Sequence, residues 1–364
     1  MTKKLLSSTV GLSCLVLLVF AVPLDAAPAP NEWDQIVAAA KKEGKLHLVG
    51  PTLNEARLAL TETFTKKYGI SVEYYGTNGP DLPPRVQSER RAGVYFWDVI
   101  IAGSTTLLKS LKPAGILEPL EPAFILPEVK DPKSWRGEPF LDKERTVLAI
   151  TRRAGQYLYV NTDLVKSGEV RSWRYLLRPE FKGKILFGRD PRLAGYSLAT
   201  TTFLFRHKDM GPEFIRQLAK QDLRILEDDR TAATWLAQGR NPICICSHTQ
   251  TGRFMKEGMP LKPVDGRQLK EGTFVTSSFA NAALPSRPRH PNAAKLYLNW
   301  LLTKEAGDLF SRATGNPSMR VDVATDYIEP WVVPLPEWPA SDTEESLKAE
   351  GPTIALLKDV LGGR

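Results

Sequence analysis

The sequence predicts an α/β protein of two lobes, each an open, mostly parallel sheet with helices on both faces. Strand-like and helix-like segments alternate along the chain, and this alternation begins a second time near Tyr157. The chain has 364 residues, a length that suits two domains, and 42% of them are hydrophobic, which is enough for a core in each. A formal net charge of +8 is too small for a dedicated nucleic-acid binder, although it permits an anionic partner.

Residues 1–27 are predicted to be a cleaved secretory signal peptide outside the fold. Lys3 and Lys4 form a short basic start, Val10–Val22 is apolar, and Ala26-Ala27 supplies small residues for cleavage. The apolar run is shorter than the about 20 residues that cross a bilayer. Cys14 lies inside this run, where a lipid-modified cysteine is not expected. We therefore expect a soluble periplasmic protein rather than a lipoprotein.

The first lobe is predicted from the segments that follow. Asn31 caps a helix with apolar residues at helical spacing, and Gly44 ends it. The next segments are a strand at Leu46–Val49, a helix near 56–68 closed by Gly69, a strand at Ile70–Tyr75, a helix at Leu82–Ala92, a buried strand at Asp98–Ala102 and a helix capped by Ser104 that runs to about Leu111.

The second lobe repeats this alternation. Its predicted elements are strands at Tyr157–Asn161, Lys184–Gly188, Leu223–Leu226 and Ile243–Cys246, and helices after Ser172, from Ser197, at Pro212–Lys220 and at Thr231–Ala237. A strand at Thr273–Leu284 then leads into a proline-rich turn. Helices are predicted after this turn at Ala293–Leu302, at Glu305–Phe310 and around Leu347–Leu361.

Cys244 and Cys246 are two residues apart in a predicted strand, in a compartment that permits disulfides. Their side chains share a face, but extended backbone between them makes a mutual disulfide strained, so none is expected. His248 continues the alternation, which leaves open a metal site formed by these three residues. The alternative that we favour is two small buried side chains followed by a loop histidine.

An ordered set of short segments resembles the type 2 periplasmic solute-binding proteins. More narrowly, it is similar to the branch that serves ABC importers for ferric iron, thiamine, polyamines and phosphonates. The matching segments are Trp33-Asp34, Ala38–Lys45, Phe96–Ile100, His290–Lys295 and Asn299–Glu305, and the match extends from about Trp33 to Arg320.

The resemblance implies a two-lobed type 2 periplasmic binding protein fold with a two-strand hinge. Lobe 1 is expected to be discontinuous, with residues 28–153 and 280–364, and lobe 2 to hold residues 154–279. A solute would be clamped between the lobes and delivered to an ABC transporter permease in the inner membrane. We expect a monomer without a cofactor, without catalytic activity and without a nucleic-acid partner.

Ligand residues are predicted at the turns that follow parallel strands, where helix N-termini present free N–H groups. Small and hydroxyl side chains at these turns let a ligand approach the backbone. The turn Gly195-Tyr196-Ser197 also lies where the family places ligand contacts. The candidates are Thr52, Thr77, Asn78, Ser104 and Thr105 in the first lobe and Asp190, Tyr196, Ser197, Asp229 and Arg230 in the second.

The solute is predicted to be a small organic anion, such as a carboxylate, phosphonate or sulfonate. Four arginines lie in or beside these turns: Arg85, Arg189, Arg192 and Arg230. Ferric-iron members of the family use adjacent tyrosines, whereas here Ser197 follows Tyr196. In the other adjacent pair, Tyr74 and Tyr75, strand alternation directs the rings to opposite faces.

Three alternatives stay open: a ferric-iron transport protein, a ligand-sensing subunit of a membrane receptor and a secreted enzyme on the same fold. An enzyme could pair Cys244 or Cys246 with His248 as nucleophile and base. Both cysteines lie within an apolar strand, however, and the sequence contains no HExxH, GxSxG, P-loop or GxGxxG segment.

Overall fold

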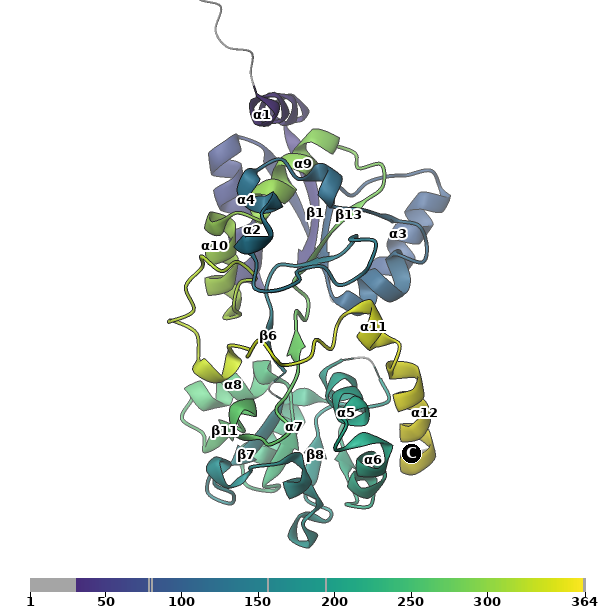
Figure 1. The fold of residues 1–364 in the computed structure, drawn as a ribbon, viewed down its shortest axis with the longest axis vertical. Coiled ribbons are helices and arrows are strands. Elements are labelled where there is room, and N and C mark those ends of the chain that lie inside the picture. The colour runs from purple at the N-terminus through teal and green to yellow at the C-terminus, as the bar shows by residue number, and fades with distance from the viewer. Residues whose placement is uncertain (1–30, 78, 80, 156, 194, 363–364) are drawn as a thin grey trace, which may run out of the picture.

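The computed structural model describes residues 31–77, 79, 81–155, 157–193 and 195–362. The predicted signal peptide and the predicted ligand residue Asn78 lie outside the described residues. The described chain forms two α/β lobes, one above the other along the longest axis (Figure 1). No helix in this part of the chain is long and apolar enough to cross a membrane.

The sheet of the first lobe has the strand order β2-β1-β3-β13-β4, and β5 pairs with β13 beside this path. β1 pairs in parallel with β2 and β3, whereas β13 is antiparallel to β3. The sheet is therefore mixed but parallel on one side. The strands are β1 (Lys45–Pro51), β2 (Ser71–Thr77), β3 (Val99–Ala102), β4 (Leu117–Glu118), β5 (Leu148–Ala149) and β13 (Asn281–Pro285).

The first helix of this lobe begins and ends where the capping signals predict. The Asn31 side chain accepts a hydrogen bond from Asp34 N at 2.9 Å, and Gly44 ends the first helix at φ 68°. The helices are α1 (Glu32–Glu43), α2 (Asn54–Tyr68), α3 (Leu82–Arg91), α4 (Pro127–Lys130), α9 (Pro291–Leu301) and α10 (Lys304–Thr314), with 3₁₀ turns at Glu121–Ala123 and Pro132–Ser134.

The sheet of the second lobe has the order β11-β7-β10-β8-β9. β8 pairs in parallel with β10 and β9, and β7 runs antiparallel to β10 and β11. Its strands are β7 (Leu158–Asn161), β8 (Ile185–Phe187), β9 (Arg224–Ile225), β10 (Ile243–Ile245) and β11 (Leu261–Pro263).

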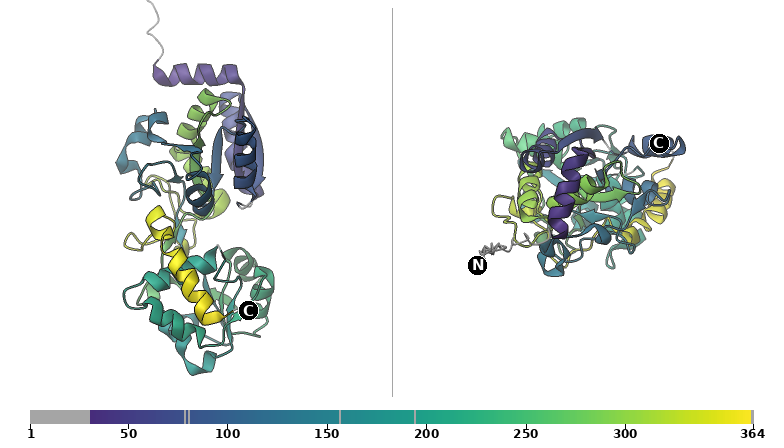
Figure 2. Two further views of the ribbon diagram at one scale, coloured as in Figure 1. Left: turned by 90° about the vertical axis from the view of Figure 1, so that its right-hand side faces the viewer. Right: turned by 90° about the horizontal axis from the view of Figure 1, so that it is seen from above.

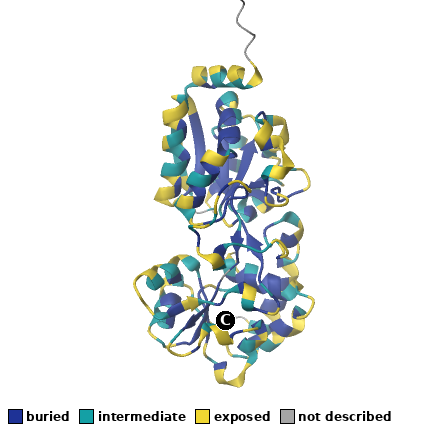
Figure 3. Ribbon diagram, turned by 60° about the vertical axis from the view of Figure 1, so that its left-hand side comes forward, coloured by how far each residue is buried: buried dark blue, intermediate teal, exposed yellow. Residues whose placement is uncertain are grey.

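The helices between the hinge strands are α5 (Tyr196–Arg206), α6 (Gly211–Ala219), α7 (Asp229–Ala237) and α8 (His248–Lys256). The helix predicted after Ser172 is only a 3₁₀ turn, Trp173–Leu177, and further 3₁₀ turns are Ser167–Glu169, Pro179–Phe181 and Gly266–Gln268. Buried residues follow the strands of both sheets (Figure 3) and form one large apolar cluster in the first lobe and two in the second.

Two short strands pass between the lobes as an antiparallel pair, β6 (Arg153–Ala154) and β12 (Val275–Thr276). This pair is the two-strand hinge that the resemblance implies. The single strand predicted at Thr273–Leu284 is divided into β12 and β13. Ser278 has φ 55° between them, and this left-handed conformation cannot continue a strand.

The chain after α10 passes the hinge and ends against the second lobe (Figure 2). Val275 N donates to Pro339 O at 2.9 Å, and Ser341 N donates back to Val275 O at 2.9 Å. After a 3₁₀ turn at Pro330–Val332, the last helices are α11 (Glu344–Leu347) and α12 (Glu350–Leu361). Residues 280–364 are predicted to belong to lobe 1, but Leu356 and Leu357 of α12 pack in the core of the second lobe.

Candidate functional site

The carboxyl ends of the parallel strands in both lobes face the hinge. In the first lobe, Ala102 at the end of β3 pairs with Asn281, which follows the hinge strand β12 by a short loop. In the second lobe, Cys246 N just after β10 donates to Tyr157 O, which lies between the hinge strand β6 and β7. The predicted ligand turns of both lobes therefore border the same region between the lobes.

Hydroxyl side chains gather at the hinge end of the first sheet. Thr77 pairs with Pro51 in the β1–β2 ladder, which places Thr77 beside Thr52. A Cβ added at Gly79 would lie 3.2 Å from Thr106 Oγ1, so the turn after β2 is close to the helix after β3. Thr106 was not predicted as a site residue, although it extends the Ser104-Thr105 pair by one hydroxyl.

Ser104 does not cap an α-helix, which corrects the prediction made for it. Residues Thr105–Leu111 form a π-helix, and the buried Ser104 side chain makes no capping hydrogen bond. Ser104 itself has helical dihedrals, φ −54° and ψ −41°, whereas an N-cap residue has extended ones. Short π-helical turns occur often at functional sites. Thr105 opens this turn and is partly exposed at the hinge end of the sheet.

Tyr196 and Asp229 meet at the hinge end of the second sheet. The Tyr196 hydroxyl donates a hydrogen bond to Asp229 Oδ1, which joins the N-termini of α5 and α7. Gly188 follows β8, and a Cβ there would lie 2.7 Å from the Tyr196 hydroxyl and 3.1 Å from Asp229 Oδ1. Only glycine leaves room for this contact. Burial raises the pKa of Asp229, and burial together with this carboxylate raises the pKa of Tyr196.

Tyr157 completes this group and was not predicted as a site residue. Its ring stacks on Tyr196 with centroids 5.1 Å apart and also stacks with Phe274 at 6.1 Å. The sequence predicted Tyr157 only as the first residue of a strand. Its stacking with Tyr196 could not be predicted, because the two residues are far apart in the sequence and meet only in the folded protein.

Arg189 is an exposed cation close to this group. It lies near Gly195, where an added Cβ would be 3.3 Å from its Nη1. Burial raises the pKa values of Tyr196 and Asp229, and the charge of Arg189 offsets part of that rise. Ser197 is fully buried at the start of α5, and its hydroxyl has no hydrogen-bond partner among the described residues.

Several of the other charged residues at the predicted turns are engaged in contacts within their own lobe and are not free to bind a solute. Asp190 binds Arg192 through both carboxylate oxygens, and Arg192 also donates to Gly362 O at 2.7 Å. The pair Asp190–Arg192 is therefore internally neutral. Arg230 is exposed on the first turn of α7. Arg85 lies over the Tyr75 ring at 4.3 Å and donates to Glu89, so it belongs to the packing around α3.

The tyrosine pair in β2 is divided as predicted. Tyr74 lies over Gly50 and donates its hydroxyl to Pro51 O at 2.6 Å. Tyr75 is on the other face, 5.4 Å from the Trp97 ring. The two phenols cannot act on one ligand.

Cys244 and Cys246 form a disulfide, which corrects the expectation that none would form. Their Cα atoms are 5.3 Å apart, within the range that a disulfide spans and shorter than the about 6.6 Å of a fully extended strand. The backbone is less extended here because β10 ends at Ile245 and the chain turns into α8 at His248. Both cysteines are fully buried. This bond excludes the alternative that was left open, a soft-metal site formed by Cys244, Cys246 and His248, and it also excludes a cysteine nucleophile.

Comparison with known proteins identifies the family. A profile described as bacterial extracellular solute-binding protein matches residues 46–315, most of the chain. The chain belongs to this family. It is the periplasmic solute-binding component of an ABC transporter and not an enzyme. Proteins of this family bind a small solute and act together with a transporter permease. Residues 316–364, which include α11 and α12, lie beyond the matched region.

Solved structures with the same fold support this assignment at the level of architecture. The ferric iron-binding protein A of Mannheimia haemolytica in an open conformation has 15% identity and a TM-score of 0.70 over 87% of this chain and 98% of its own. Iron-bound HitA from Pseudomonas aeruginosa has 20% identity and 0.64, over 87% and 99%. AfuA from Actinobacillus pleuropneumoniae, with fructose-6-phosphate bound, has 18% and 0.63, over 88% and 99%.

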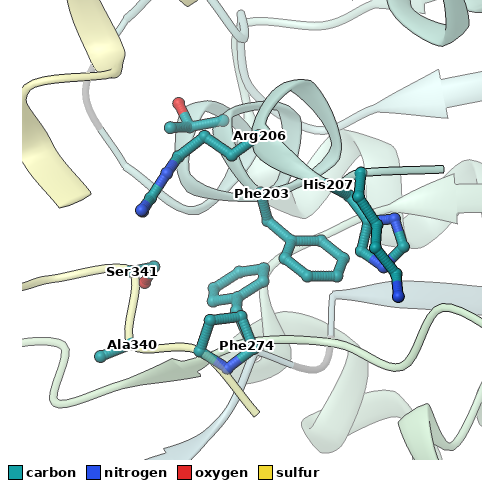
Figure 4. Close-up of a pocket in the computed structure, with 9 residues that line it drawn as sticks. Phe203, Arg206, His207, Phe274, Ala340 and Ser341 are labelled. Carbon is teal, nitrogen blue, oxygen red and sulfur yellow. The ribbon is translucent and has the colours of Figure 1, made fainter. Parts of the chain in front are cut away.

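A hollow of about 290 Å³ in this solute-binding protein lies apart from the predicted ligand residues. It is bounded by the last turn of α5, by Phe274 and by the terminal segment at Pro339–Ser341 (Figure 4). The Phe203 and Phe274 rings face each other there with centroids 5.5 Å apart, and Arg206 lies above Ser341. The hollow therefore separates the terminal segment from the second lobe and is not the region between the strand ends.

Proposed function

We propose that this protein captures a small organic anion between its lobes by hinge closure and delivers it to an inner-membrane permease. The observation that supports an anion is Arg189, an exposed guanidinium beside the N-terminus of α5. A guanidinium and a helix N-terminus both stabilise carboxylate, phosphonate or sulfonate groups. Hydroxyls of Thr52, Thr77, Ser104 and Thr105 would contact the same ligand from the first lobe when the hinge closes.

The charges around Tyr157, Tyr196 and Asp229 in the second lobe are compatible with a bound anion. The Asp229 carboxylate accepts a hydrogen bond from the Tyr196 hydroxyl, so one of its oxygens is already occupied within the protein. Arg192 is neutralised by Asp190 and contributes little. Arg189 and Arg230 remain as the exposed cations of these turns.

Ferric iron is the second candidate, since ferric-binding proteins share this fold. Iron held by phenolates needs tyrosines that ionise readily. Here the Tyr196 pKa is raised by burial and by Asp229, and the Tyr74 hydroxyl is bonded to a backbone carbonyl. These contacts favour an organic anion over iron.

The exported form in this proposal is a periplasmic monomer without residues 1–27. One solute is held between two lobes of one chain, so a second copy is not needed to complete the site. The closed state is stabilised only when one ligand contacts both lobes at once.

A thermal-shift screen tests the choice of ligand. We expect the melting temperature to rise with one class among carboxylates, phosphonates and sulfonates, because a ligand that binds only the folded state stabilises it. Arg189→Ala should abolish this rise, since it removes the exposed cation. Arg178→Ala, which removes an exposed arginine paired with Glu180 away from the strand ends, should leave the rise unchanged.

Two results would contradict the proposal. A rise with ferric iron alone would favour iron in spite of the tyrosine contacts. An anion response of equal size in Arg189→Ala would place the anion elsewhere on the protein.

A further inference from the structure

Two of the four histidines of the chain lie together at the end of the first sheet that is opposite to the hinge. His47 is near the beginning of β1, and its ring is 5.0 Å from the ring of His290, which precedes α9. The ladder register pairs His47 with Glu73 near the beginning of β2. His47 is 4% exposed, and a hollow of about 240 Å³ opens beside both histidines and Glu73.

Both imidazole rings are held through Nδ1. His47 Nδ1 lies 2.9 Å from Phe96 O, and a carbonyl oxygen can only accept, so this nitrogen carries the proton. His290 Nδ1 lies 2.8 Å from the carboxylate of Asp98, which likewise accepts. Asp98 is fully buried and fixed by two backbone donors, His47 N at 2.7 Å and His290 N at 2.6 Å.

This arrangement is the one that metal-binding histidines have in proteins. Their second nitrogen donates to a carboxylate or a backbone carbonyl, which fixes the ring and leaves the other lone pair for the metal. Here Asp98 and Phe96 O are the fixed acceptors, and Nε2 is the nitrogen left on each ring. A carboxylate is also present, because Glu73 Oε2 lies 3.1 Å from His47 Nε2.

We propose that His47 Nε2, His290 Nε2 and the Glu73 carboxylate bind one zinc ion or a similar divalent transition metal. Two imidazoles and one carboxylate are an established zinc ligand set, with a fourth position for water. The three proposed ligand groups are neighbours: the two rings have centroids 5.0 Å apart, Glu73 Oε2 is 3.1 Å from His47 Nε2, and all three residues line the same hollow. A tetrahedral zinc ion needs its ligand atoms about 3.4 Å apart, so binding requires the His290 ring to rotate towards this pair.

The surroundings limit the expected affinity. Lys45 binds the other Glu73 oxygen at 3.0 Å, and Arg289 also borders the hollow. Both cations oppose a metal ion, and Lys45 would have to release Glu73. The Lys45 side chain is 58% exposed, so it can move into water at little cost. We therefore expect micromolar binding, at a place separate from the solute.

Calorimetric titration of zinc into untagged, EDTA-treated protein made from the full chain tests this proposal. We expect one ion per chain, and we expect Glu73→Gln and His290→Ala each to weaken binding at least about tenfold. His207→Ala is the matched control, since His207 lies on the second lobe, and it should bind zinc like the unchanged protein. Cobalt should give a visible absorption band that both site variants lose.

Glu73 and His290 are chosen because they lie at the rim, so their replacement leaves the buried His47 and Asp98 in place. Melting temperatures without metal show whether each variant is folded. Absence of zinc binding by the unchanged protein would overturn the proposal. Equal affinity in folded Glu73→Gln and His290→Ala would overturn it as well, because the ion would then be bound elsewhere.

Discussion

His248 is a histidine that the fold keeps neutral. Its Nδ1 is 2.9 Å from the Tyr159 hydroxyl, and its ring meets Trp331 edge-on at 5.1 Å. Burial, with Arg153 and Lys256 nearby, lowers the pKa of His248 from 6.5 to about 3. The folded protein therefore binds a proton here less readily than the unfolded chain does.

Stability should depend on this residue in acid. Because the folded pKa is the lower one, stability is complete above pH 6.5 and falls as pH decreases from 6.5 towards 3. Between pH 7 and pH 5 the loss should be about 2 kcal/mol in the free energy of unfolding. Urea denaturation at both values measures it. His248→Asn should remove most of this loss, whereas His207→Asn should keep it; an unchanged loss in His248→Asn would assign the acid sensitivity to other groups.

The solute residues show what residue-level patterns could and could not predict. The turns after parallel strands predicted Tyr196 and Asp229, because strand ends and helix N-termini can be located from the sequence alone. Their mutual hydrogen bond, and the stacking of Tyr157 on Tyr196, could not be predicted since they join separate turns. The cysteine expectation was wrong because it assumed fully extended backbone from Cys244 to Cys246, whose Cα atoms are only 5.3 Å apart.

Lys112 connects three elements around the hinge side of the first lobe. It follows the π-helix, and its Nζ lies 3.0 Å from Asp142, 2.5 Å from Glu144 and 2.8 Å from Glu344 at the start of α11. The Asp142 side chain is completely buried, whereas Glu344 is half-exposed. These carboxylates raise the pKa of Lys112.

Removal of the Lys112 charge should be costly. Lys112→Met leaves the buried Asp142 without its cation and should lower the free energy of unfolding by about 3 kcal/mol. Lys348→Met is the control: this lysine is 69% exposed and pairs with Glu345, which is 75% exposed, so its loss should change stability by less than about 0.5 kcal/mol. Urea denaturation compares them. If Lys112→Met lowered the free energy of unfolding as little as Lys348→Met does, the Asp142 carboxylate would not depend on the Lys112 charge.

Elements with strong local signals were predicted well, as the caps at Asn31, Gly44 and Gly69 show. Elements that depend on distant contacts were not. The π-helix after Ser104 has the composition of an ordinary helix, and the break at Ser278 lies in a segment with strand-like residues on both sides. The position of α12 on α5 and α6 is set by tertiary packing of Leu356 and Leu357, which the amphipathic pattern leaves undetermined.

Two connections join the lobes of the whole molecule: the β6–β12 pair and the C-terminal segment, which crosses the hinge. Lys109 of the π-helix pairs with Glu350 of α12, while Arg267 of the second lobe donates to Val333 O at 2.8 Å. Trp338 packs against Gly266 and Gly272 beside the hinge. Rotation of the lobes therefore has to be compatible with these contacts.

Hinge closure predicts a change of shape. Small-angle scattering should give a smaller radius of gyration after addition of an anion that raises the melting temperature, since the lobes approach one another. Arg189→Ala with the same anion should keep the radius of the ligand-free protein. A radius that stays constant when the unchanged protein is saturated would contradict closure, even if the ligand binds.

The Cys244–Cys246 bond has a practical consequence for such measurements. Both sulfurs are joined in the disulfide and buried, and the third cysteine of the chain, Cys14, lies in the predicted signal peptide. Cysteines introduced singly on the surface of each lobe would then be the reactive thiols of the exported protein. A donor and an acceptor dye attached to them would report the separation of the lobes in real time, without removal of a native residue.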